Sequence, residues 1–109
     1  TKLSTDVYAI GNPFIELAYN NNPENGDTLT LTSTAGVTKT YEFRSSGTAA
    51  AGNLQVAIQG NARLTYGSLN SKIQSASGHN GGSDNSVLIL SHTLGGTVNE
   101  GIFKITSKL

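Results

Sequence analysis

The chain has 109 residues, with seven basic and seven acidic side chains and a formal net charge of zero at pH 7. This length is enough for one domain with a single modest core. A neutral chain in which 13% of residues are charged offers no electrostatic attraction to nucleic acid or to an anionic membrane. The absence of cysteine excludes disulfides, thiol catalysis and thiolate metal sites. No apolar run approaches the roughly 20 residues that a membrane-spanning helix needs.

The N-terminal segment is expected to be extended. Residues 1–6 are polar, whereas residues 7–19 are apolar and are interrupted at Pro13, which prevents one continuous central strand. The large apolar side chains of this segment must be covered, either by the chain's own sheet or by a neighbouring subunit. The candidate partner-interface residues are Tyr8, Ile10, Phe14, Ile15, Leu17 and Tyr19. We therefore divide the chain into an extended N-terminal arm, residues 1–19, and a single β-rich domain, residues 20–109.

Residues 27–43 show the alternation of two half-buried strands. Leu29 and Leu31 share one face of the first strand, and Tyr41 and Phe43 share one face of the second. The small, glycine-containing segment 34–37 between them favours a tight turn. The resulting hairpin has one apolar face, which another part of the chain must cover.

The middle of the chain supplies a third strand and a helix. Leu54, Val56 and Ile58 alternate with polar or small residues, which predicts a strand. In residues 61–76 the apolar positions recur at intervals of four and three, which predicts an α-helix with one buried face. The residues of that face are Ala62, Tyr66, Leu69, Ile73 and Ala76. We expect this helix to cover the apolar face of the hairpin.

The C-terminal part is predicted to contain two more strands. Residues 78–85 are glycine-rich and polar and are expected to form a loop. Residues 86–92 contain four consecutive apolar side chains, which favours a strand buried on both faces near the middle of a sheet. Residues 101–107 are expected to pair with this strand in antiparallel orientation. The predicted fold is α+β, mainly antiparallel β with five or six strands, and one α-helix (about residues 61–76) packed on the sheet.

The ionisable residues show no motif of a catalytic or metal site. The histidines, His79 in an expected flexible loop and His92 at a strand end, lie outside any known metal-binding spacing. The carboxylates that lie at strand ends or on exposed faces are Asp27, Glu42, Asp84 and Glu100. Turn capping and solubility account for them, although a pair of carboxylates that converges in space, as in a glycosidase, is invisible in a sequence. The asparagine-rich loop before Asp27 lacks the ligand spacing of a calcium loop. We predict no enzyme activity, no catalytic, cofactor-binding or metal-binding residue, and no cofactor.

The order of the motifs is similar to that of a module found in virion structural proteins of tailed bacteriophages. The chain contains GDTLTL, a turn, TKTYEF, a small-residue loop, LQVAI followed by GN, a helix with Leu69 and Ile73, VLIL, and GGTVNEG before the last strand. The resemblance covers roughly residues 25–106. The chain departs from the pattern at Glu100, where an asparagine is expected after the glycines.

This resemblance implies an architectural protein of a capsid, tail or fibre without enzyme activity. For a chain of this size it implies a capsid decoration or cement protein on the surface of the virion. The expected partners are the major capsid protein or other virion subunits, together with self-association, for which a trimer is one option. The alternatives are a tail, fibre or other extracellular assembly subunit, and a receptor- or glycan-binding module. In the glycan-binding alternative Tyr8 and Tyr19 are the candidate contact residues.

Overall fold

A computed structural model describes residues 5–9, 14–33, 36–81 and 88–107. The described residues form seven strands and one helix. In chain order these are β1 (Thr5–Ala9), β2 (Phe14–Tyr19), β3 (Thr28–Thr32), β4 (Thr38–Arg44), β5 (Leu54–Ala57), α1 (Ala62–Gln74), β6 (Leu88–Leu94) and β7 (Gly101–Ser107). The predicted α+β class, with mostly antiparallel strands and one helix, is confirmed.

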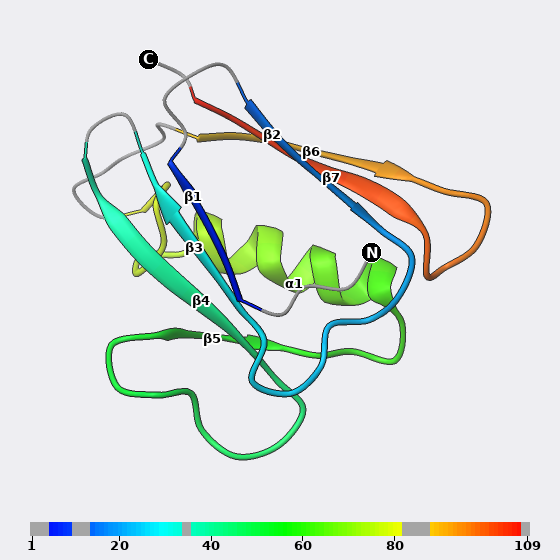
Figure 1. Ribbon diagram of the computed structural model, residues 1–109, viewed down its shortest axis with the longest axis horizontal. Helices are drawn as coiled ribbons and strands as arrows, with labels where there is room; N and C mark the ends of the chain where they lie inside the picture. Colours follow the sequence, from blue (N-terminus) through cyan, green and yellow to red (C-terminus); the bar gives the residue numbers. More distant parts are fainter. Residues whose placement is uncertain (1–4, 10–13, 34–35, 82–87, 108–109) are drawn as a thin grey trace.

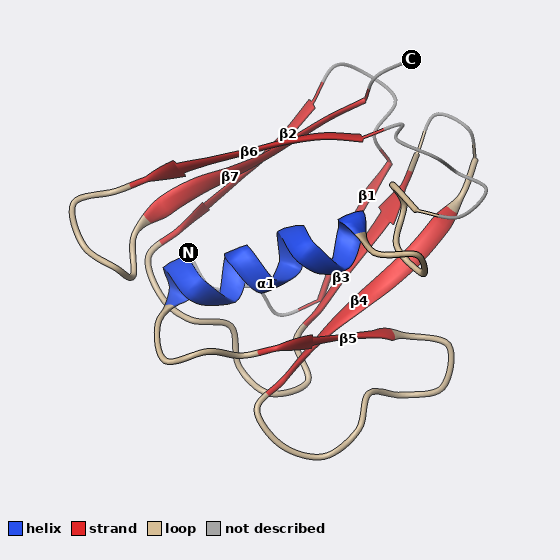
Figure 2. Cartoon of the chain, turned by 180° about the vertical axis from the view of Figure 1, so that it is seen from behind, coloured by secondary structure: helices blue, strands red, loops and turns tan. Residues whose placement is uncertain are grey.

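The strands form two sheets. The first has the order β1-β3-β4-β5, in which the predicted β3–β4 hairpin is antiparallel and the two outer strands, β1 and β5, run parallel to their neighbours. The second has the order β2-β7-β6 and is antiparallel throughout. Helix α1 lies along one open side of the two sheets, next to β5 of the first and β6 of the second (Figures 1 and 2).

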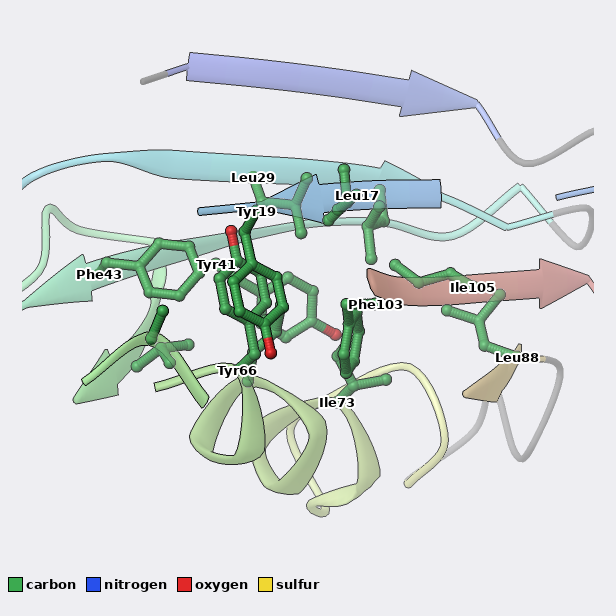
Figure 3. Packing of buried hydrophobic residues seen from close by; sticks show 14 residues of the cluster. Leu17, Tyr19, Leu29, Tyr41, Phe43, Tyr66, Ile73, Leu88, Phe103 and Ile105 are labelled. Atoms are coloured by element: carbon green, nitrogen blue, oxygen red, sulfur yellow. The ribbon is translucent and has the colours of Figure 1, made fainter. Parts of the chain in front are cut away.

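The core lies where the two sheets and the helix meet. Leu29, Leu31, Tyr41 and Phe43 from the hairpin are fully buried, as their alternation predicted. The helix contributes the predicted residues of its buried face, here Ala62, Tyr66, Leu69 and Ile73, whereas Ala76 lies beyond the helix and is exposed. The second sheet adds Leu17, Tyr19, Leu88, Phe103 and Ile105. Figure 3 shows these side chains converging between the helix and the strands.

The ring of Tyr19 connects the second sheet to the helix. It stacks on Tyr66 with a centroid distance of 4.2 Å and an interplanar angle of 6°. Tyr19 is also paired with Gly101 in the β2–β7 ladder. A Cβ atom added to Gly101 would lie 2.5 Å from the Tyr19 hydroxyl oxygen. Glycine at position 101 therefore leaves room for the tyrosine to cross the neighbouring strand.

Two sequence-based expectations are corrected by the structure. Residues 86–92 were expected to lie near the middle of a sheet, but β6 is an edge strand and β7 is the central one. In β6 the inward residue Leu88 is buried while Ser91 is exposed, so β6 is covered on one face only. His79 was expected in a flexible loop, but its side chain is completely buried.

Candidate interaction surface

The residues predicted to contact a partner lie mostly in the folded body. Residues 14–19 form β2, which pairs with β7, so this part of the predicted arm belongs to the second sheet. Leu17 and Tyr19 are buried in the core, and Ile15 is partly buried against it. These residues are therefore covered by the chain's own sheets, which was one of the two alternatives. Ile10 and the side chains of Tyr8 and Phe14 lie outside the part of the chain that the structure describes.

His92 belongs to a partly buried cluster at the end of the second sheet. Its Nε2 is hydrogen bonded to the Tyr19 hydroxyl, and its ring meets Phe103 edge-on at a centroid distance of 5.7 Å. Burial, assisted by the positive charge of Arg63, lowers the pKa of His92. Burial also raises the pKa of Tyr19, against the opposing effect of Arg63. Burial thus disfavours the charged form of both groups within the fold.

His79 connects the end of the helix to the β3–β4 hairpin. Its Nε2 donates to the Val37 carbonyl oxygen at 3.1 Å, because a carbonyl can only accept a hydrogen bond. Its Nδ1 lies 2.7 Å from the Tyr41 hydroxyl, which also accepts the His79 backbone N–H at 3.1 Å. Both ring nitrogens therefore take part in structural hydrogen bonds.

The carboxylates of the first sheet organise loops. Glu42 is buried on the outer side of the sheet and accepts hydrogen bonds from Asn53 at 2.8 Å, the Ala50 backbone at 3.0 Å and Arg44 at 2.5 Å. The bonds from Asn53 and Ala50, followed by the interaction with Arg44, lower the pKa of Glu42. Asp27 accepts the backbone N–H of Glu24 at 2.8 Å, in the loop before β3. These bonds match the expected turn-capping role.

The histidine and carboxylate side chains of the described residues are dispersed with respect to a metal site. The described residues contain no group of three or more histidine and carboxylate side chains arranged to hold a metal ion. Of the carboxylates considered for a convergent pair, Asp27 and Glu42 lie at neighbouring positions of the β3–β4 hairpin, Glu100 lies in the β6–β7 connection, and Asp84 lies outside the described residues. The groups that carry acid–base chemistry in other proteins here hold the fold together.

A surface groove lies between the exposed side of α1 and β5. It has a volume of about 630 Å³. Its lining residues are Gln55, Val56, Ala57, Gln59, Arg63, Leu64, Gly67, Ser68, Ser71, Lys72 and Ser75. Both charged residues of this set are cations, and no carboxylate is among them. The groove combines an open strand edge with a positive charge.

Sequence reasoning did not predict this groove. Periodicity assigned only the buried face of the helix, and the parallel pairing of β5 with β4 leaves no signature in residue order. The one available signal was the run of glycine and serine residues at helical spacing on the face opposite the core, at positions 67, 68, 71 and 75. That run permits close approach but does not identify a ligand.

Apolar side chains are also exposed near the β6–β7 connection. The large exposed apolar residues of the described surface are Leu64, Leu94, Val98 and Ile102. Three of them lie in or beside the β6–β7 hairpin, and Leu64 lies in the first turn of α1. The hairpin contacts that turn, because the backbone N–H of Arg63 donates to the Val98 carbonyl at 2.8 Å.

The fold and the groove together define an α+β domain with a surface suited to binding. No protein-family model, curated protein or solved structure gives a significant match to the chain. Among the described residues, no helix has the length and apolar character needed to cross a membrane.

Proposed function

We propose that the protein is a non-enzymatic structural subunit of a bacteriophage virion, and that it decorates and stabilises the capsid by bridging its subunits. The observation that carries this proposal is the use of ionisable side chains. His79, His92, Glu42 and Asp27 all take part in internal hydrogen bonds, while a groove and several apolar side chains remain exposed. Such a distribution suits a protein that binds other proteins.

A decoration protein gains stability from its partner and gives stability in return. A partner that binds only the folded form of this domain stabilises it by mass action. The same linkage stabilises the assembled capsid, since each bound copy must dissociate before the subunits it bridges can separate. The order of sequence motifs shared with virion structural modules supports this role, with the major capsid protein as the partner.

The test is deletion of the coding sequence from the phage genome that carries it. We expect heads that assemble but release DNA at a lower temperature, and that regain stability when the purified protein is added in saturable amounts. Heads that show the same stability with and without the protein would contradict the proposal. Saturable binding of the isolated protein to host glycans, without binding to heads, would instead support the receptor-binding alternative.

A further inference from the structure

The strand that forms one wall of the groove has an unpaired edge. Among the residues that the structure describes, β5 is the outermost strand of the first sheet and pairs only with β4. The Ile58 N–H donates to the Arg44 carbonyl at 2.9 Å, which shows which alternate residues of this strand direct their backbone groups toward β4. Because alternate residues of a strand direct their backbone groups to the same side, Val56 faces β4 while Gln55 and Ala57 direct their N–H and C=O groups away from it.

The open edge is short and bounded at its C-terminal end. The backbone N–H of Gln59 donates to the Thr65 hydroxyl at 2.8 Å, and the Gln59 side chain donates to Ser68 at 3.0 Å. These bonds join the chain after β5 to the helix, so the edge ends at Ala57. Over the four residues of β5, a partner segment has room for about two residues that pair directly with Gln55 and Ala57.

The opposite wall of the groove allows another backbone to approach. The helix presents Gly67, Ser68, Ser71 and Ser75 to the groove. Nothing lies within 4 Å of the position that a Cβ atom would occupy on Gly67. At these positions the helix wall carries only small side chains, which favours the close approach of an extended chain.

The charge of the groove selects among extended chains. Arg63 and Lys72 line the groove, and no carboxylate opposes them there. The Nη2 of Arg63 makes only long contacts of 3.4 and 3.5 Å to the Gly95 and Thr97 carbonyls. The guanidinium group thus has donor capacity left for a carboxylate ligand.

We infer that the groove binds an extended acidic segment of a partner protein, which adds to the edge of β5 as a further strand. Backbone hydrogen bonds to Gln55 and Ala57 orient the bound segment along the strand. Carboxylates of the segment that face Arg63 and Lys72 give the preference for acidic sequences. A peptide matches the edge because its donors and acceptors have the spacing of a strand. One short contact of this kind is weak, but many copies on one particle bind with avidity. This inference deepens the proposed function, because it names the partner chemistry for the exposed groove.

The experiment titrates the intact protein with a short blocked peptide that alternates threonine with glutamate, and follows amide hydrogen exchange by NMR. We expect the peptide to slow exchange of the Gln55 and Ala57 amides and to leave the already paired Val56 amide unchanged. The matched peptide with glutamine in place of glutamate should bind more weakly. The same peptide N-methylated at alternate backbone nitrogens should not protect the two amides.

Three variants of helix α1, one of them a control, test the groove from its helix wall. Ser71→Trp fills the groove from an exposed helix position and should weaken peptide binding about tenfold or more through steric exclusion. Asn70→Trp places the same ring outside the groove and should bind like the wild type. Lys72→Gln should raise the peptide Kd by about two- to fivefold, and less at high salt.

Each outcome separates this inference from the proposed function. Absence of amide protection at saturating peptide, or equal binding by Ser71→Trp and Asn70→Trp, would overturn the groove as a strand-addition site. Heads that still bind the Ser71→Trp variant fully would show that the protein decorates capsids through another surface. Peptide binding with the expected amide pattern, in a protein that does not bind heads, would support the groove and overturn the virion role.

Discussion

The burial of His92 makes the stability of the protein depend on pH. Burial and the nearby Arg63 charge lower the pKa of His92 in the folded state, whereas the unfolded chain has the ordinary value of about 6.5. As the pH falls below about 6.5, the unfolded state therefore takes up the proton first, and the free energy of unfolding decreases. The contribution is complete above this pH and is lost as the pH falls toward the folded-state pKa.

Urea unfolding of the wild type at about pH 8 and about pH 5.5 measures this loss. The control is His92→Gln, which keeps a polar side chain but cannot take up a proton. The charged or titratable groups around His92 are Tyr19 from β2, and Arg63 and Tyr66 from α1, and all three are common to both proteins. The variant should lose less stability between the two pH values, and an equal loss in both proteins would contradict the assignment.

At the scale of the element, the start of helix α1 is held by three different partners. Asn61 is the N-cap, and its side chain accepts the Leu64 N–H at 3.0 Å. The β6–β7 connection supplies the other acceptors, since the Asn99 side chain accepts the Ala62 N–H at 3.0 Å and the Val98 carbonyl accepts the Arg63 N–H. The hairpin thus satisfies donors that a helix cannot satisfy by itself.

The substitution Asn61→Ala should lower the free energy of unfolding by about 1 kcal/mol, because it removes the cap from the Leu64 N–H. Chemical denaturation gives this value directly, and amide exchange at Leu64 should become faster. Asn61→Asp keeps an acceptor at the cap and should retain most of the stability. A loss equally large in Asn61→Asp would show that the asparagine acts through something other than its acceptor oxygen.

The elements that were predicted well are those whose own periodicity defines a face. The intervals of apolar residues placed Tyr66, Leu69 and Ile73 on the buried side of the helix, and alternation placed Leu29 and Phe43 on the inner side of the hairpin. Both patterns depend only on the geometry of the local backbone.

The features that were predicted poorly depend on how the elements are arranged. The edge position of β6 and the burial of His79 against Tyr41 involve residues far apart in the chain. The groove requires that β5 pair parallel to β4 on one side and remain unpaired on the other. A run of apolar residues such as that in β6 has the same appearance in a central strand and in an edge strand that is covered on one face.

At the scale of the whole molecule, β2 is an integral part of the folded body, because it pairs with the central strand β7. Leu17 and Tyr19 of β2 are both buried in the core. β1 pairs only with β3, at the outer edge of the first sheet. A chain shortened to residues 14–109 should therefore fold, whereas one shortened to residues 20–109 should not.

Removal of residues 1–19 should cost much more free energy of unfolding than removal of residues 1–13. Loss of a large buried side chain costs about 2 to 5 kcal/mol, and removal of β2 deletes two such side chains together with the β2–β7 ladder. That sum is comparable to the whole stability of a small domain, about 5 to 15 kcal/mol. Removal of residues 1–13 deletes one edge ladder and leaves the Tyr19–Tyr66 stack in place.

Thermal unfolding followed by near-ultraviolet circular dichroism should show a cooperative transition for 14–109 and none for 20–109. A cooperative transition of similar midpoint in both chains would mean that β2 does not contribute to the core.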